Sequence, residues 1–166
     1  MIKRELYLNQ LIEYIDKPLI KVITGIRRCG KSVLLMLLHD ELLKRGVDEK
    51  HIIYLNFESF EISEIENAEK LYRYVKSRTT GRQRYYILLD EIQEVNMWEK
   101  AVNSFLVDLN ADIYITGSNS RLLSSELATY LAGRYVEIHL FTLSFSEYLL
   151  FRKERSGSEP ADVRHE

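Results

Sequence analysis

The chain has 166 residues, of which 46% are hydrophobic and 29% are charged, a balance that indicates one globular domain and excludes a disordered chain. Its formal net charge of -2 excludes an overall electrostatic attraction to nucleic acid. One cysteine excludes an internal disulfide, and the lack of a signal sequence or a membrane-length apolar run predicts a cytoplasmic protein without a membrane partner.

Apolar residues recur along the sequence with helical and strand patterns in alternation. Helical spacing predicts helices over residues 4–15, 32–43, 64–78, 98–109 and 124–131. Short β-rich runs predict strands over residues 19–24, 51–58, 85–91, 112–119 and 134–141. Ser144 and Glu147 have the spacing of a capping box and predict a last helix over residues 145–151. Residues 152–166 are polar and lack periodicity, so we expect a domain over residues 1–151 and then a flexible tail.

Five strands that alternate with helices predict a three-layer α/β domain with a mainly parallel sheet. Right-handed crossovers bring the carboxyl ends of parallel strands to the same edge of a sheet. Polar residues that directly follow different strands are therefore expected to lie close together in space, although they are far apart in the sequence.

The stretch TGIRRCGKS, residues 24–32, joins a predicted strand to a predicted helix and has the pattern Gly25-x4-Gly30-Lys31-Ser32. Glycines there let backbone N–H groups turn inward around a phosphate, and the helix N-terminus adds a partial positive charge. Lys31 would reach the β- and γ-phosphates, and the Ser32 hydroxyl would ligate Mg²⁺. The alternative is an ordinary glycine-rich turn. The candidate nucleotide-binding residues are Gly25, Ile26, Arg27, Arg28, Cys29, Gly30, Lys31, Ser32 and Val33.

Two adjacent carboxylates, Asp90 and Glu91, follow a mostly apolar strand. Asp90 would hold the Mg²⁺ shell and Glu91 would polarise an attacking water, whereas the plainer alternative is a pair of acidic residues that begins a loop or caps a helix. The strand at 52–57 lies between this motif and the glycine loop, which favours a P-loop NTPase with a catalytic glutamate (ASCE or RecA-like). We therefore expect the strand order 5-1-4-3-2. No base-reading NKxD motif occurs, so ATP is preferred over GTP.

Weaker candidates follow the last two strands. In ITGSNS, Ser118 and Asn119 would sense the γ-phosphate, or they form an ordinary turn. Arg134, and less convincingly Arg121, would neutralise the transferring phosphoryl group in cis or in trans, or would be a surface arginine paired with a carboxylate. The basic residues of the loop at 78–84 are interpreted as solvated rather than as a nucleic-acid contact.

The variable positions of the glycine loop hold an arginine pair and the single cysteine. We hypothesise that Arg27 and Arg28 point away from the phosphates, toward a neighbouring segment or a partner domain, because these positions contribute their backbone N–H groups to the phosphate. Cys29 is expected to fill a small site.

Four segments together resemble a family of AAA-type ATPases of bacteria and archaea: ITGIRRCGKSVLL, LLDEIQEV..WE, ITGSNSRLLSSELATYLAGRYVEIHL and LSFSEYL. The resemblance implies that the arginine pair and the LAGRY segment are family hallmarks. It also implies a continuation beyond the ATPase domain, with a winged-helix-like segment and a C-terminal domain similar to restriction endonucleases. On this resemblance the chain is a truncated member or the ATPase domain alone.

From the motifs and the resemblance we expect a domain that binds Mg²⁺ and ATP and hydrolyses ATP slowly as a conformational switch. The expected catalytic residues are Lys31, Glu91, Asn119 and Arg134, and the expected metal ligands are Ser32 and Asp90. A non-hydrolysing ATP-binding interaction module is the main alternative. A small-molecule kinase is a weaker one, because no lid-like array of arginines is present. Besides ATP, a protein partner or the C-terminal domain of the family is expected, and the oligomeric state stays open.

Overall fold

The computed structural model describes residues 4–118, 131 and 133–156. Its centre is a five-stranded parallel sheet in the order β2-β3-β4-β1-β5. Read from the other edge, this is the predicted order 5-1-4-3-2, and the prediction is confirmed. The strands are β1 (Ile20–Gly25), β2 (Ile52–Asn56), β3 (Tyr85–Asp90), β4 (Ala111–Thr116) and β5 (Tyr135–Leu140).

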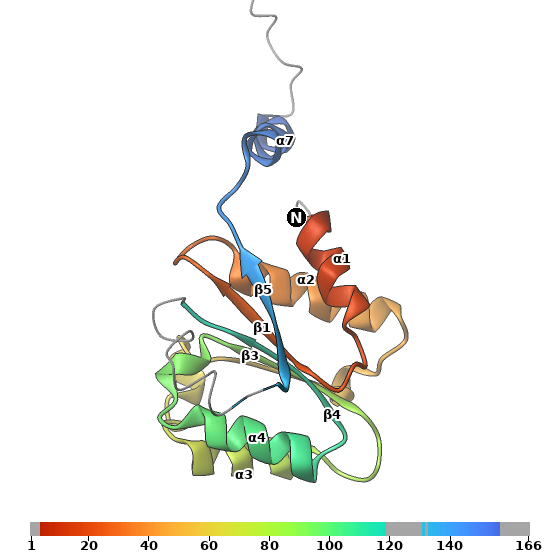
Figure 1. Cartoon of the computed structure of the whole chain (residues 1–166), viewed down its shortest axis with the longest axis vertical. Helices are drawn as coiled ribbons and strands as arrows, with labels where there is room; N and C mark the ends of the chain where they lie inside the picture. Colours follow the sequence, from red (N-terminus) through yellow and green to blue (C-terminus); the bar gives the residue numbers. More distant parts are fainter. Residues whose placement is uncertain (1–3, 119–130, 132, 157–166) are drawn as a thin grey trace, which may run out of the picture.

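Helices cover both faces of the sheet, with α1 and α2 on one face and α3 and α4 on the other (Figure 1). The helices are α1 (Glu5–Glu13), α2 (Lys31–Lys44), α3 (Ala68–Arg78), α4 (Trp98–Asp108) and α7 (Phe145–Ser156). Short 3-10 turns lie at Glu49–His51, Phe60–Ile62 and Ile92–Glu94. Among the described residues, the helices are all too short or too polar to cross a membrane.

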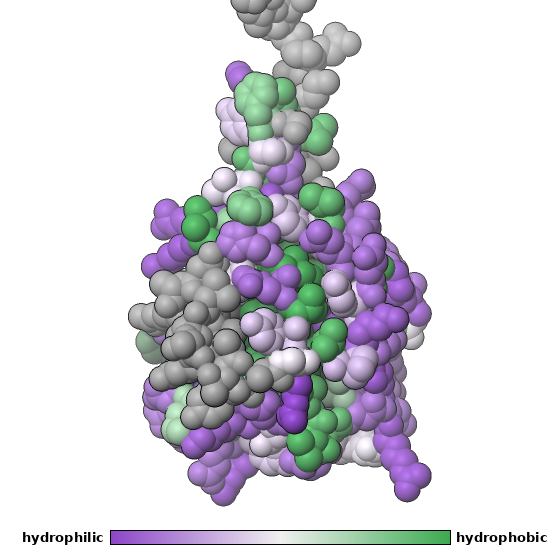
Figure 2. Space-filling view, viewed as in Figure 1, coloured by the Kyte–Doolittle hydropathy of each residue, from purple (hydrophilic) through white to green (hydrophobic). Residues whose placement is uncertain are grey.

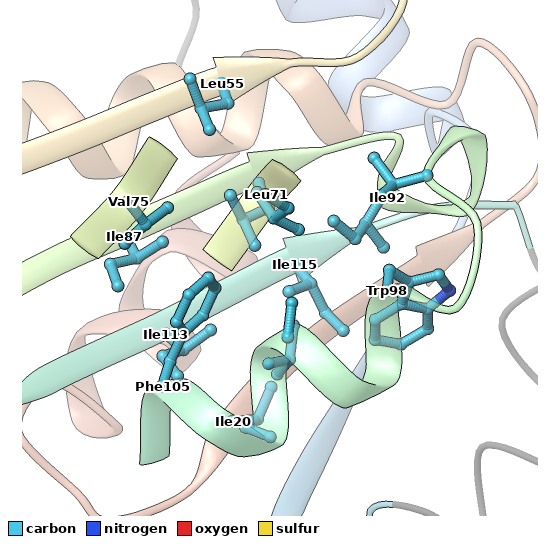
Figure 3. Packing of buried hydrophobic residues seen from close by; sticks show 14 of the residues in the cluster. Ile20, Leu55, Leu71, Val75, Ile87, Ile92, Trp98, Phe105, Ile113 and Ile115 are labelled. Carbon is cyan, nitrogen blue, oxygen red and sulfur yellow. The ribbon is translucent and has the colours of Figure 1, made fainter. Parts of the chain in front are cut away.

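The two faces of the sheet bury two separate apolar cores. Because side chains alternate along a strand, Ile87 and Leu89 of β3 pack toward α3 and α4, whereas Leu88 packs toward α1 and α2. Figure 3 shows the first core, in which Phe105 of α4 and Leu71 of α3 meet the strand side chains. Both faces of the strands are covered, as expected for a parallel sheet, and this rigid layer carries the loops at its carboxyl edge.

Two predicted helix boundaries differ from the structure by more than two residues. Helix α3 begins at Ala68 rather than at 64, because the Asn67 side chain accepts a hydrogen bond from the Lys70 N–H (3.0 Å) and caps the helix there. Helix α7 continues to Ser156, beyond the expected end at 151, since residues 152–155 are good helix formers and glycine follows at 157. The helix expected at 124–131 lies outside the described residues except for Leu131.

Helix α7 begins with the predicted capping box. The Ser144 N–H donates to Glu147 Oε2 (2.8 Å), and the Glu147 N–H donates to Ser144 Oγ (3.2 Å). The helix projects beyond the carboxyl edge of the sheet (Figure 1), and the projecting part displays apolar side chains (Figure 2). Phe145, Leu149 and Leu150 are all exposed there. The chain thus leaves the sheet through a helix that adds little to either core.

Candidate functional site

The glycine loop lies where β1 ends and α2 begins, at the carboxyl edge of the sheet. Gly25 has φ 154°, and a Cβ built on it would lie 2.5 Å from the Leu140 carbonyl oxygen and 2.6 Å from Cys29 Sγ. Gly30 has φ 102°, a conformation that disfavours any other residue. Both glycines of the motif are therefore required by the backbone of this turn, which aims the N-terminus of α2 at the loop.

Lys31 is the first residue of α2, and its side chain is 3% exposed. Its Nζ lies 3.5 Å from the Gly25 carbonyl oxygen, 3.4 Å from that of Ile26 and 3.2 Å from Glu91 Oε1. The ammonium group thus folds back over the loop and pairs with the second acidic residue after β3. Ser32 follows in the first turn of α2 and is half-buried. The loop, Lys31 and Glu91 form one continuous site.

Asp90 ends β3 and is completely buried. Its Oδ1 accepts a hydrogen bond from Thr116 Oγ1 (2.5 Å) and its Oδ2 accepts one from the Tyr54 hydroxyl (3.1 Å). Burial, and then the nearby Asp90 charge, raise the pKa of Tyr54 well above its ordinary value, so the hydroxyl stays protonated and donates. Asp90 is therefore held in one orientation by the two strands that flank β3.

Glu91 has a left-handed backbone conformation with φ 55°, unusual for a residue other than glycine. Its N–H donates to Thr116 Oγ1 (2.9 Å), so one hydroxyl at the end of β4 organises both acidic residues. On its side chain, Oε1 contacts Lys31 Nζ and Oε2 accepts a hydrogen bond from Gln93 Nε2 (2.6 Å). Thr116 and Gln93 were not identified from the sequence. The signal for Thr116 was its place at the tip of β4, within the predicted ITGSNS motif.

The acidic pair fits a magnesium ion bound together with phosphate. No lysine, arginine or histidine among the described residues forms an ion pair with Asp90, whose carboxylate oxygens accept from the Tyr54 and Thr116 hydroxyls. A buried carboxylate without a cationic partner is costly, and Mg²⁺ prefers carboxylate and hydroxyl oxygens while it keeps several waters. Asp90 and Ser32 lie at the same sheet edge, beside the loop, and are the residues that would hold such an ion.

The variable loop residues differ in their exposure, since the two arginines are exposed and the cysteine is buried. Arg27 is exposed, and its Nη2 lies 3.4 Å from Glu58 Oε1, in the segment after β2. Arg28 is exposed and has a left-handed φ of 67°. Cys29 is buried in the core beneath α1 and α2. Ile26 and Val33 are largely exposed at the two ends of the loop.

An apolar cavity of about 160 Å³ adjoins the loop on the side of α2. Its lining comes from the loop, from α2, from the residue before α1 and from the segment around α7. The lining residues are Arg4, Arg28, Cys29, Gly30, Val33, Leu34, Leu37, Leu143 and Phe151. The cavity is thus open to the phosphate loop and mainly apolar, which suits a flat aromatic group.

The structure does not bring Arg134 to this site. The parallel register pairs Ile20 with Tyr135 and Gly25 with Leu140, so Arg134 precedes β5 at the amino edge of the sheet. The loop lies at the opposite, carboxyl edge, and a role of Arg134 in the same molecule is therefore wrong. The error arose because Arg134 comes before its strand, whereas the other candidates follow theirs. Asn119 and Arg121 lie outside the described residues, and Ser118 lies at their border.

Arg4 is a buried residue of the site region that the sequence did not indicate. Its guanidinium donates to the carbonyl oxygens of Cys29 (3.2 Å) and Phe141 (2.8 Å) and to both Glu147 carboxylate oxygens (2.8 and 3.2 Å). The pairing lowers the pKa of Glu147 to about 2. Arg4 thereby joins the glycine loop to the end of β5 and to α7.

Comparisons with known proteins show which family the chain resembles. A family model described as an AAA domain matches residues 17–149. An uncharacterized protein of Haemophilus influenzae is 48% identical over 163 residues, which make up 98% of this chain and 41% of that protein. An uncharacterized protein of Methanocaldococcus jannaschii is 37% identical over 133 residues, 80% of this chain and 29% of that protein. The chain spans less than half the length of these relatives.

Solved structures share the fold at low sequence identity. The Aeropyrum pernix ORC1 protein in complex with DNA matches with a TM-score of 0.63 at 16% identity, over 95% of this chain and 50% of that one. A DNA polymerase III gamma subunit-related protein from Thermotoga maritima matches with a TM-score of 0.61 at 16% identity, over 89% of this chain and 49% of that one. DnaA from Aquifex aeolicus with bound AMPPCP matches with a TM-score of 0.54 at 16% identity, over 97% of this chain and 52% of that one.

Proposed function

Because the chain belongs to the AAA domain family, whose model matches residues 17–149, we propose that it binds Mg·ATP and hydrolyses it slowly as a conformational switch. The observation that carries this proposal is the convergence of Lys31 and Glu91, whose Nζ and Oε1 atoms lie 3.2 Å apart between the glycine loop and the end of β3. A cation for phosphate and a carboxylate for water are thus in contact at one sheet edge.

On this proposal the loop binds phosphate through its backbone. The N–H groups of residues 26–31 and the N-terminus of α2 bind the β-phosphate. The Lys31 ammonium group then leaves Glu91 and pairs with phosphate oxygens instead. Glu91 Oε1 is then free to accept a hydrogen bond from the attacking water. Ser32 and Asp90 would hold Mg²⁺, which would supply neutralisation of phosphate charge. The apolar cavity beside α2 receives the base.

A switch that binds ATP without turnover is the second candidate. It is favoured by the same ion pair, because both oxygens of Glu91 are engaged by Lys31 and Gln93 in the present state. If phosphate does not displace Lys31 from Glu91, the water is not activated. A trans-acting group or the part of the relatives that this chain does not span would then be needed for hydrolysis.

Phosphate release by the purified chain, measured beside equilibrium binding of ATP and GTP, tests the proposal. Lys31→Ala should weaken ATP binding at least tenfold, and Lys44→Ala, at the exposed far end of the same helix, is the matched control. Glu91→Gln should retain binding and lower the turnover rate by about 100-fold, the usual contribution of a general base.

Each outcome separates the candidates. Equal phosphate release by the wild type and Glu91→Gln would contradict the role of Glu91. Tight binding by the wild type without any phosphate release would support the non-hydrolysing switch. Unchanged ATP binding by Lys31→Ala would reject the glycine loop as the nucleotide site, and equal affinity for GTP would reject the preference for ATP.

A further inference from the structure

Gln93 lies in the 3-10 turn that directly follows β3, two residues after Glu91. The left-handed backbone of Glu91 turns the chain so that the Gln93 side chain returns to the Glu91 carboxylate, with Nε2 2.6 Å from Oε2. An unfavourable backbone conformation persists only where its surroundings hold it, and here the Thr116 hydroxyl holds the Glu91 N–H. The backbone of this turn therefore places the Gln93 side chain beside the Glu91 carboxylate.

The chemistry of the two groups decides how the amide is oriented. An ionised carboxylate only accepts hydrogen bonds, so Gln93 must present its NH₂ group to Glu91. The carbonyl Oε1 of the same amide is buried and has no hydrogen-bond partner among the described residues. Buried polar atoms are normally paired with protein or with water, and an exception requires an explanation. Gln93 therefore uses its amide donor for Glu91, and this hydrogen bond fixes the orientation of the amide.

We propose that Gln93 positions the Glu91 carboxylate for catalysis through the hydrogen bond from Nε2 to Oε2. The inference rests on the proposed ATPase function. When phosphate takes Lys31 away, Gln93 keeps the Glu91 side chain in place through Oε2 while Oε1 becomes available. The water then donates a hydrogen to Glu91 Oε1, and Gln93 fixes the direction from which that oxygen accepts it.

The test uses three substitutions, with turnover and ATP binding measured separately. Gln93→Met keeps the length of the side chain but removes the donor and the acceptor. Gln93→Glu keeps acceptors but cannot donate to Glu91 and places a second negative charge beside it. Gln83→Met, in the exposed loop before β3 at the opposite edge, is the matched control and should leave both quantities unchanged.

We expect Gln93→Met to lower kcat by about 10- to 100-fold, the effect of losing one hydrogen bond to a charged group, with ATP affinity within twofold of the wild type. Gln93→Glu should be impaired at least as much. In a Glu91→Gln background, Gln93→Met should change the residual rate by less than twofold, because Gln93 acts through Glu91. A role in folding alone would not produce this dependence.

The opposite results would overturn the inference. They are a kcat of Gln93→Met within twofold of the wild type, full activity of Gln93→Glu, or a further tenfold loss on adding Gln93→Met to Glu91→Gln. A wild type that binds ATP but releases no phosphate would overturn the hydrolytic function together with this inference. An active wild type with an unaffected Gln93→Met variant would overturn the inference alone.

Discussion

Replacing Arg4 by methionine tests the contacts that join α7 to the glycine loop. The Arg4 side chain is 6% exposed and lies over the Tyr7 ring, 4.5 Å from its centroid. Its guanidinium donates to Glu147 and to carbonyl oxygens of residues 29, 141 and 142. Methionine retains most of the apolar stem but removes the charge and every donor. We therefore expect a loss of stability with the overall fold retained.

The magnitude follows from the partners that Arg4 leaves behind. Removing one member of a buried ion pair costs about 3–5 kcal/mol, because the other charge stays unpaired. The Glu147 side chain is 26% exposed and regains some water, which places the loss at the lower end, at about 3 kcal/mol. For a domain of this size, each kcal/mol corresponds to about 2–4 °C, so the Tm should fall by about 6–12 °C.

Urea and thermal unfolding followed by circular dichroism measure this loss. Arg45→Met is the matched control, because Arg45 pairs with Glu41 on the surface of α2 (3.0 Å) and should change stability by less than about 0.5 kcal/mol. Arg4→Lys should recover only part of the loss, since an ammonium group cannot bridge two oxygens as a guanidinium does. A loss below about 1 kcal/mol for Arg4→Met, or a fully stable Arg4→Lys, would refute the reasoning.

Two further predictions concern buried and paired charges. Arg4 lowers the pKa of Glu147 from its ordinary 4.5 to about 2. The stability from this pair is therefore complete above about pH 4.5 and is lost as the pH falls from 4.5 to 2. In urea unfolding at a series of pH values, the free energy of unfolding of Glu147→Gln should fall less steeply over this range than that of the wild type. At the amino edge of the sheet, the fully buried Lys21 pairs with Asp112, which also accepts from the Tyr114 hydroxyl (2.9 Å). Asp112→Asn should therefore cost about 3–5 kcal/mol and Lys21→Met less, because Asp112 retains donors; equal losses on urea unfolding would contradict this asymmetry.

The fold was predictable because its signals are local and repeated. Most strands are short β-rich runs and most helices show apolar spacing, and crossover handedness then limits how they assemble. The glycine loop was predictable for the same reason, since a strand, two glycines and a helix are neighbours in the sequence. The approach of Glu91 to Lys31 followed from the common edge of the parallel strands.

Contacts between distant residues were not predictable. Thr116 of β4 contacts Asp90 of the adjacent strand β3, 26 positions away in the sequence. Arg4 contacts Glu147, 143 positions away. A threonine at a strand end and an arginine before a helix are ordinary in sequence, and only their burial distinguishes them. Arg134 illustrates the converse error. An arginine suits phosphate, but this one precedes β5 and therefore lies at the amino edge of the sheet.

On the proposed function the two adjacent carboxylates have different roles, and their surroundings differ in a way that suits these roles. Asp90 is fully buried, and both its oxygens accept from hydroxyls of neighbouring strands, so it has no freedom to change partners. The Glu91 side chain is 14% exposed, and one of its partners is Lys31, which phosphate can also bind. A metal ligand must be held in place, whereas a group that activates water must be released when substrate arrives. On the proposed mechanism, the left-handed turn at Glu91 is what separates the two requirements within one dipeptide.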